Sequence, residues 1–275
     1  ARSSAIGVLM RVLAAIFLLL LGAAPVEAAA TDWAELAPDT RIRLIASETW
    51  SGEGRTMIAL ELDMPANTKT YWRVPGETGI PTELDLGGSS GVTGQEFIWP
   101  YPQIEQQAGY TDFVYYGPTI IPVELTVEHG SPVIEASILM GICSDICVPA
   151  TAKFTLHLAI GRNDIGSDLR IAQALALAPV PWRDQPDPVG DVTFDESGGG
   201  ISIAVDPGIV DPASVIADTS GTGHILGAPQ KSPEPGVVVL PLLGGGDGPT
   251  LQGQSILITY MTDRGPFETW RQVGR

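Results

Sequence analysis

The chain is poor in cysteine, histidine and basic residues. Its 275 residues include two cysteines, three histidines, and 15 lysines and arginines against 32 acidic residues, giving a formal net charge of −17. Affinity for nucleic acid comes mainly from Lys and Arg side chains that neutralise phosphates. The composition therefore argues against nucleic acid as a partner, and the acidity fits the solubility of an exported protein.

The few histidines also limit the chemistry that the chain can perform. His129, His157 and His224 show no paired spacing that would complete a zinc site with two thiolates. They form no constellation with a Ser or Cys nucleophile that would indicate a hydrolase. No glycine-rich phosphate loop occurs in a strand-to-helix context. We therefore expect no metal and no cofactor.

Long apolar runs are missing after the N-terminus. No later stretch approaches 18 uninterrupted apolar residues, so we expect the mature chain to be soluble. The N-terminus carries Arg2 and Arg11, then an apolar run over 12–24, then small residues through Ala30. That layout predicts a signal peptide over 1–30, cleaved after Ala28 or Ala30. The apolar run is shorter than the ~20 residues that a membrane-spanning helix needs.

Short β-prone runs separated by Gly, Pro and Asn fill the chain from Thr40 to Phe154. Residues 41–50 and 57–64 read as neighbouring strands joined by a Gly-rich turn. Further strands are predicted at 97–101, 119–127, 133–140 and 153–160. The last run alternates cleanly, with Phe154, Leu156, Leu158 and Ile160 on one face and Lys153, Thr155 and His157 on the other. Many short strands with regular turns favour an antiparallel sandwich.

The pattern changes after residue 163. The Ala- and Leu-rich stretch 164–178 predicts one helix that starts at Asp164 or Ser167 and stops at Pro179. Residues 179–188 contain four prolines and read as a semi-rigid connector. Strands resume at 191–194, 201–205, 237–243, 255–261 and 267–273. We therefore expect an all-β protein with a first domain over 31–162, a helix and connector over 163–188, and a second, smaller β-sandwich over 189–275.

The two cysteines lie four positions apart, at the end of a predicted strand. If Ser144, Asp145 and Ile146 form a hairpin turn, Cys143 and Cys147 face each other with Cα atoms about 4.4–6.8 Å apart. One continuous strand would separate them by roughly 13 Å, too far to bond. A bridge over so short a loop adds only about 2 kcal/mol of stability. That favours redox chemistry over a structural role.

Two alternatives remain open from the residues alone. The first is a non-catalytic secreted β-sandwich that binds a partner and carries a permanent structural disulfide. The second is a copper(I)-handling protein that uses Cys143, Cys147 and Met140.

Four segments together carry a family resemblance. They are "TKTYWRVPGETGIP" at 68–81, "FIWPYP" at 97–102, "IIPVELTV" at 120–127 and "CSDICVPA" at 143–150. In this order they resemble the periplasmic N-terminal (alpha) domain of the DsbD and ScsB thiol:disulfide interchange proteins. The YWR-x-PG-x-x-GIP stretch and the three-residue cysteine spacer are closer to the ScsB branch. The resemblance covers roughly residues 35–180.

The resemblance implies an immunoglobulin-like sandwich that carries electrons in the periplasm, a redox carrier of the protein-disulfide reductase type. Such a domain accepts reducing equivalents from a membrane-embedded donor. It passes them to thioredoxin-like periplasmic proteins, including disulfide isomerases and cytochrome c maturation factors. The sequence contains neither a multi-span membrane domain nor a thioredoxin domain, so we expect a standalone form. Either a separate membrane protein supplies its electrons, or the fold has been reused for another role.

The resemblance also implies roles for individual residues. By position, Cys147 forms the intermolecular mixed disulfide and Cys143 resolves it. Tyr71 and Trp72 match an aromatic position that lines the cysteine pocket. A cap loop maps to about 100–116, with Tyr101, Tyr110 and Phe113 as candidate shielding aromatics. Apart from the resemblance, Asp145 and Glu105 are candidates to tune the thiol pKa, because a nearby carboxylate disfavours a thiolate, although a role in the turn is the preferred interpretation of Asp145.

Overall fold

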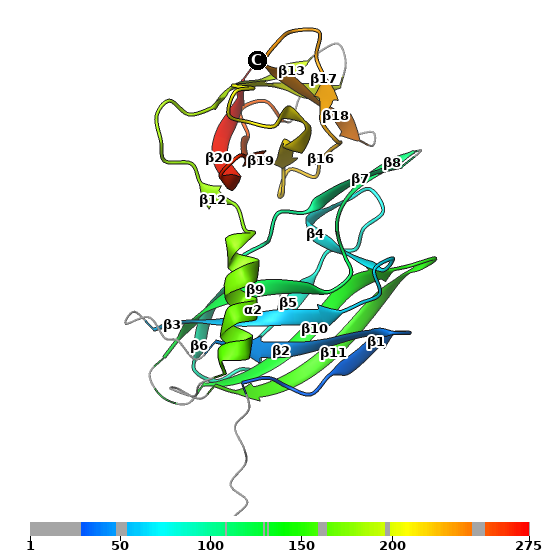
Figure 1. The fold of residues 1–275 in the computed structure, drawn as a ribbon, viewed down its shortest axis with the longest axis vertical. Coiled ribbons are helices and arrows are strands. Elements are labelled where there is room, and N and C mark those ends of the chain that lie inside the picture. Colours follow the sequence, from blue (N-terminus) through cyan, green and yellow to red (C-terminus); the bar gives the residue numbers. More distant parts are fainter. Residues whose placement is uncertain are drawn as a thin grey trace, which may run out of the picture.

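The structure is a computed structural model that describes residues 29–47, 54–107, 109–128, 130, 132–158, 164–195, 199–243 and 251–274. The predicted signal peptide lies outside these residues, except for its last two positions. Among the residues so described, no helix is both long and apolar enough to cross a membrane. Figure 1 shows two β-rich parts joined by one helix.

Two antiparallel sheets form the first β-rich part. The first sheet has the order β1-β2-β3-β9-β6. Its strands are β1 Ala34–Ala37, β2 Thr40–Ala46, β3 Arg55–Asp63, β9 Thr119–Val127 and β6 Val92–Phe97. The second sheet has the order β11-β10-β4-β8-β7, with β5 paired to β10. Its strands are β11 Cys147–His157, β10 Val133–Cys143, β4 Lys69–Gly76, β8 Tyr110–Tyr116, β7 Gln103–Gln107 and β5 Glu83–Asp85.

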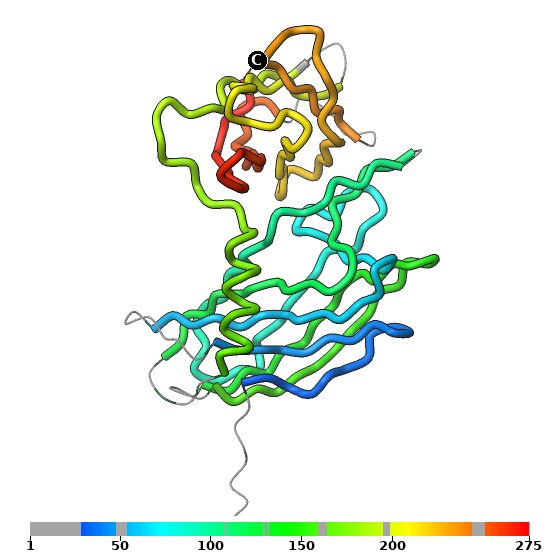
Figure 2. Tube along the Cα trace, in the orientation of Figure 1, coloured from blue at the N-terminus to red at the C-terminus, as the bar shows by residue number. Residues whose placement is uncertain are grey.

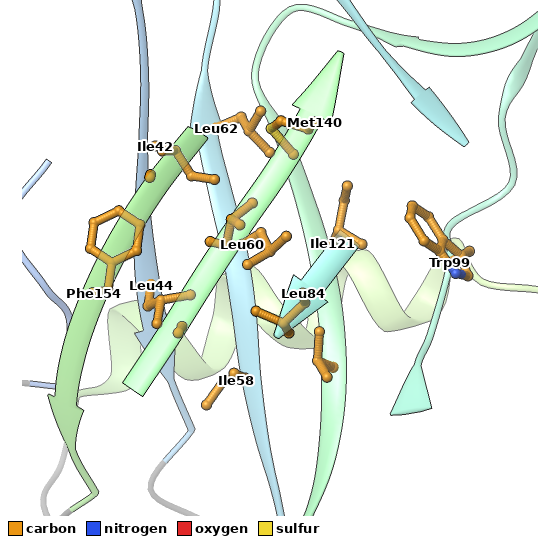
Figure 3. Close-up of a cluster of buried hydrophobic side chains, with 14 of the residues drawn as sticks. Ile42, Leu44, Ile58, Leu60, Leu62, Leu84, Trp99, Ile121, Met140 and Phe154 are labelled. Carbon is orange, nitrogen blue, oxygen red and sulfur yellow. The ribbon is translucent and has the colours of Figure 1, made fainter. Parts of the chain in front are cut away.

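Inward-facing side chains of both sheets meet in one core. Figure 3 shows Leu60 and Ile121 of the first sheet gathered with Met140 and Phe154 of the second. Phe154 and Leu156 of β11 and Leu158 just after it are buried, whereas Lys153, Thr155 and His157 are exposed, which confirms the predicted alternation. Ile160 lies outside the described residues. The predicted pairing of the first two strands is also confirmed, from Arg41↔Asp63 to Ala46↔Ile58.

The prediction of a strand over 97–101 is wrong. β6 ends at Phe97, and the backbone N–H of Tyr101 donates to the carbonyl of Leu177 instead of to a neighbouring strand. Pro100 and Pro102 lack the N–H that a ladder requires, so the chain leaves the sheet here. Sequence reasoning also missed β4 and β8 as strands. β4 is almost wholly buried and carries Lys69, so it shows no alternation of apolar and polar residues.

Helix α2 (Ile165–Ala176) covers the outer face of the first sheet (Figure 1). Ile171 packs against Ile45 and Ala59, and Leu175 adds to the same cluster. The predicted start at Asp164 is confirmed, because this residue is the N-cap and its side chain accepts a hydrogen bond from the Ser167 N–H. The helix stops just before Pro179, as predicted.

The second β region has its own core. Its strands are β12 Val180–Pro181, β13 Val189–Asp195, β14 Gly200–Val205, β15 Ile216–Asp218, β16 Ile225–Leu226, β17 Gln230–Lys231, β18 Val237–Leu243, β19 Ser255–Thr262 and β20 Gly265–Gly274, with a short 3₁₀ turn η1 at Pro212–Ser214. They follow the order β15-β19-β20-β13-β14-β18-β16. Ile203, Leu240, Ile258 and Tyr260 are fully buried between them.

All five strands predicted for the second β region are confirmed within a few residues. The connector over 179–188 departs from the prediction at one place, because β12 forms a short parallel pairing with β20. Figure 2 traces the chain from the first sandwich through α2 and this connector into the second β region.

The N-cap of α2 gives the first testable prediction. Hydrogen bonding from Ser167 holds the pKa of Asp164 below its usual value, so its stabilising contribution exists above the unfolded-state pKa and is lost as pH falls through the folded one. Asp164→Ala should lower the free energy of unfolding at pH 7 by about 1 kcal/mol. The deficit should shrink below pH ~4. Urea denaturation at several pH values measures both effects.

The matched control is Asp191→Ala, which removes an exposed carboxylate on β13. It should change the free energy of unfolding by less than about 0.5 kcal/mol. Equal losses in the two variants would contradict a capping role for Asp164.

Candidate functional site

Cys143 and Cys147 close the hairpin formed by β10 and β11. The two residues are directly opposed across the ladder, and Ser144, Asp145 and Ile146 form the turn. Their sulfurs form a disulfide, with Cα atoms 4.0 Å apart. The predicted hairpin is confirmed, and the Cα atoms lie slightly closer than the expected range of about 4.4–6.8 Å.

The two cysteines differ in their exposure. Cys143 is 1% exposed and packs with Tyr71 and Val114 on the outer face of the second sheet. Cys147 is exposed, and its neighbours Ile146 and Val148 are 74% and 39% exposed. A protein that approaches this hairpin therefore meets Cys147 first.

Tyr71 of β4 contacts both sulfurs. Its hydroxyl oxygen lies 2.8 Å from Cys143 Sγ and 3.4 Å from Cys147 Sγ. Because the sulfurs of a disulfide carry no hydrogen, the tyrosine hydroxyl is the donor. Tyr71 is itself fully buried, so this contact is shielded from water.

Two glycines make room for the Tyr71 ring. A Cβ atom at Gly79 would lie 2.5 Å from one edge of the ring, and a Cβ atom at Gly141 would lie 2.9 Å from the other. No real Cβ contact is that short, so each glycine is needed for the position of the ring. The loop after β4 is fixed by Thr78, whose N–H and hydroxyl donate to the Asp112 carboxylate at 3.0 Å and 2.5 Å. These contacts explain why Tyr71, Thr78 and Gly79 occur together in the 68–81 motif.

A buried charge cluster lies beside Tyr71. The Lys69 ammonium donates a short hydrogen bond to the Glu105 carboxylate and lies 3.4 Å from Asp112 Oδ2. The three side chains are 9%, 11% and 0% exposed, respectively. Glu105 also accepts from the Tyr116 hydroxyl at 2.9 Å. With two carboxylates and one ammonium, the cluster carries a formal charge of −1.

Burial and charge shift the pKa values of this cluster. Burial raises the pKa of Tyr71, and this outweighs the lowering by Thr78 and Lys69, so the phenol stays protonated at neutral pH. Burial would lower the pKa of Lys69, but the hydrogen bond and charge of Glu105 raise it overall. Burial would raise the pKa of Glu105, but hydrogen bonds, foremost from Lys69, lower it overall. Lys69 and Glu105 therefore stay charged, and Tyr71 remains a donor.

The structure separates the other candidate aromatics. Trp72 points into the sandwich core, where its ring lies 6.0 Å from that of Phe113, and both are almost fully buried. Tyr110 lies near the charge cluster, with its ring 5.5 Å from Lys69 Nζ. The Tyr101 hydroxyl donates to the carbonyl of Ser214 in the second β region, at 2.5 Å. Of the five aromatics, the structure thus brings Tyr71 to the sulfurs and Tyr110 to the neighbouring cluster.

The remaining candidates have clear positions. Asp145 is exposed in the hairpin turn, and Glu105 acts on Lys69 rather than directly on a sulfur. Met140 is fully buried in the sandwich core. It lies three residues before Cys143 on β10, and residues at odd separations on a strand point to opposite faces. The copper(I) set of Cys143, Cys147 and Met140 therefore does not gather in this fold.

Sequence reasoning missed Lys69, Thr78 and Asp112. One signal was present, because Lys69 and Tyr71 are two apart in a β-prone run and so share a face. Nothing local pointed to Asp112, which reaches the site through the pairing of β8 with β4.

These features define an immunoglobulin-like β-sandwich with a paired-cysteine site at one hairpin end. Residues 37–159 match the family model described as "Thiol:disulfide interchange protein DsbD, N-terminal". The crystal structure of the N-terminal periplasmic domain of ScsB from Proteus mirabilis is similar over 90% of this chain and 99% of that chain, with a TM-score of 0.70 and 21% identity. Residues 37–159 are therefore similar to the DsbD N-terminal family, and the chain shares the fold of the ScsB domain. The likeness in fold extends into the second β region.

A second solved structure, the GAE domain of GGA2p from Saccharomyces cerevisiae, covers 46% of this chain and 98% of its own. Its TM-score of 0.27 and identity of 10% are too low to support any argument. No curated protein sequence matches the chain.

The charge cluster gives the second prediction. Lys69→Met leaves two buried carboxylates without their ammonium, which should lower the free energy of unfolding at pH 7 by roughly 3–5 kcal/mol. Protonation relieves buried unpaired carboxylates, so the deficit should narrow as pH falls toward about 4. Urea denaturation at several pH values measures this loss of free energy of unfolding.

The control is Lys153→Met, which removes an exposed lysine of β11. If it lowered the free energy of unfolding as much as Lys69→Met, the pairing of Lys69 with the two carboxylates would be refuted.

The glycine beside Tyr71 gives the third prediction. Gly141→Ala places a methyl group 2.9 Å from two ring atoms of Tyr71 and 3.0 Å from Ile80. Overpacking of this kind should lower the free energy of unfolding by about 1–3 kcal/mol. Gly94→Ala is the control, because the nearest atom to its added methyl group is the Thr126 hydroxyl at 3.3 Å. Thermal or urea denaturation should rank the two variants in that order, and the reverse ranking would contradict the close fit.

Proposed function

We propose that this chain is a thiol:disulfide exchange module in which Cys143 and Cys147 cycle between dithiol and disulfide. One observation carries the proposal: a buried and an exposed cysteine form a disulfide whose two sulfurs share a single buried hydroxyl donor, Tyr71. A bridge that served only as a staple would need neither an exposed cysteine nor a dedicated donor. The match of residues 37–159 to the DsbD N-terminal family supports the same reading.

The unequal exposure of the two cysteines supports one order of the exchange steps. In the dithiol form, the Cys147 thiolate attacks one sulfur of a partner disulfide, so a mixed disulfide forms and the second partner sulfur leaves as a thiolate. The Cys143 thiolate then attacks Cys147 Sγ, which closes the intramolecular disulfide and breaks the mixed one. Two electrons and two protons pass to the partner, which becomes a dithiol. Cys143, at 1% exposure, is reached only from within the chain.

Tyr71 supports the step at the buried sulfur. A thiolate at Cys143 has almost no access to water, and burial disfavours the charged form unless a donor compensates. The Tyr71 hydroxyl, kept protonated by burial, supplies that donor at 2.8 Å. The net negative charge of Lys69, Glu105 and Asp112 beside it disfavours a long-lived thiolate and so favours closure of the disulfide.

The proposal extends to organisation and partners. Residues 1–30 would be a cleaved signal peptide that directs the chain to the periplasm. Residues 31–162 would form the exchange domain, 163–188 the helix and connector, and 189–275 a second β domain. A membrane-embedded donor would reduce the cysteine pair, which would then reduce thioredoxin-like periplasmic proteins such as disulfide isomerases and cytochrome c maturation factors.

The fourth prediction concerns the redox equilibrium of the pair. In glutathione buffers, read by thiol alkylation and mass shift, the pair should exchange reversibly with a potential above about −300 mV, the upper bound for structural disulfides. A bond that resists reduction until the fold is lost would leave a structural staple and overturn the proposal.

Single-cysteine variants test the assigned order. Cys143→Ser leaves the exposed Cys147, which should accumulate a stable mixed disulfide with glutathione. Cys147→Ser leaves the buried Cys143, which should react more slowly by about tenfold or more because access limits thiol exchange. Equal rates for the two variants would contradict the assigned roles.

A further inference from the structure

The strand that carries Tyr71 is irregular just beyond it. β4 pairs regularly with β8 up to Tyr71↔Val114, and the next pair is Gly76↔Asp112, with a register shift between them. β4 thus advances five residues while β8 advances two. The segment 72–75 is therefore a bulge. On its other side, β4 pairs with β10 through Lys69↔Cys143. Bulges beside active sites re-aim side chains, and their ladder restraint is weaker.

Arg73 ties this bulge to the second β region. Its Nε lies 2.9 Å from Asp218 Oδ2 of β15. Its Nη2 donates to the Thr259 hydroxyl of β19 at 3.0 Å and lies 3.4 Å from Glu268 Oε2 of β20. The ionic side chains of Arg73, Asp218 and Glu268 are 18%, 11% and 21% exposed. At such burial, ion pairs are screened far less than they are at the surface.

Other contacts close the same junction. The Arg73 guanidinium lies 4.4 Å from the centre of the Trp72 ring. Ile216 of the second β region is 1% exposed and belongs to the core cluster of the first sandwich. The Tyr101 hydroxyl bonds the carbonyl of Ser214. Figure 1 shows β4, β7 and β8 at the end of the first sandwich that faces the second β region. The junction is therefore packed as well as charge-paired.

Tyr71 is the last residue of β4 that pairs regularly with β8 before the bulge. Gly79 and Gly141 restrict its ring from two edges, but neither fixes where the backbone between Tyr71 and Gly76 lies. A hydrogen bond weakens steeply once its distance or angle departs from the favoured range. If a shift of about 1 Å in the bulge were passed on to Tyr71, it would weaken the contact to Cys143.

We propose that Arg73 is a positioning residue for thiol exchange: its contacts with Asp218, Thr259 and Glu268 fix the bulge and so hold Tyr71 on the two sulfurs. The inference rests on the proposed exchange function and gives the second β region a part in it. That region then acts on the redox site from a separate core, through a side chain two residues from Tyr71.

The test is a double-mutant cycle on the full mature chain, with the rate of disulfide reduction by glutathione as the readout. Arg73→Gln and Tyr71→Phe should each slow reduction about fivefold or more, the scale of one lost hydrogen bond. In the Tyr71→Phe background, Arg73→Gln should add little further slowing, because both changes remove the same contact. Arg73→Lys, which keeps the charge but loses the planar fork, should restore part of the rate.

Arg43→Gln is the matched control. Arg43 pairs with Glu61 at 2.6 Å, with side chains 22% and 12% exposed, and stacks on Trp33, but it lies in the first sheet. It should leave the exchange rate unchanged. If Arg73→Gln unfolds the protein, the milder Asp218→Asn and Thr259→Val, which weaken the same junction, should show the slowing and the same dependence on Tyr71.

The outcomes separate this inference from the proposed function. A wild-type pair that does not exchange with glutathione overturns both. A wild-type pair that exchanges normally, with rates unaffected by the Arg73 and Asp218 variants, overturns the positioning role alone. Slowing by Arg73→Gln that persists in full in the Tyr71→Phe background also overturns it, because Arg73 would then act by another route.

Discussion

The register of the β10–β11 hairpin is the constraint on which the site depends. It runs from Val133↔His157 to Cys143↔Cys147 and places the even-numbered side chains of β10, and those of β11 from Ala150 to Leu156, in the core. A slip of one residue would turn Phe154 and Leu156 toward solvent and separate the cysteines. The burial of apolar side chains along the two strands therefore also fixes the pairing of Cys143 with Cys147 at their end. The disulfide is the last pair of a ladder whose register is set by hydrophobic packing elsewhere.

The outer face of the second sheet is where the protein departs from simple sandwich rules. Such a face is usually solvated, but here Tyr71, Val114 and Cys143 are buried in a small cluster of their own. The loop after β4 covers Tyr71, and Lys69, Glu105 and Asp112 satisfy one another beside it. Buried charges are costly unless they are paired and hydrogen-bonded. Their presence next to a disulfide is therefore better explained by the needs of the site than by stability.

The fold alone does not assign the activity, because sandwiches of this kind serve many functions. The proposed activity rests on an exposed cysteine, a buried cysteine and one phenol that reaches both sulfurs. The similarity to ScsB extends over both β regions, and the junction between them is built on the strand that supplies that phenol. The second β region thus contacts the strand that carries Tyr71.

The sequence by itself determined the elements with a clear period: the alternating strands, the capped helix, the two β-rich parts and the cysteine hairpin. These depend on residues close to one another in the chain, so local patterns record them. It did not reveal that Tyr71 faces the sulfurs while Trp72 faces the core. It also did not reveal that β4 is a strand, because the charged residues Lys69 and Arg73 are not expected in a buried strand. Lys69 and Arg73 can be buried because each pairs with carboxylates that are distant in sequence. Glu105 lies 36 residues from Lys69, and Glu268 lies 195 residues from Arg73. Only the tertiary structure brings such pairs together, since a buried charge is tolerated only where a remote segment supplies its counter-charge.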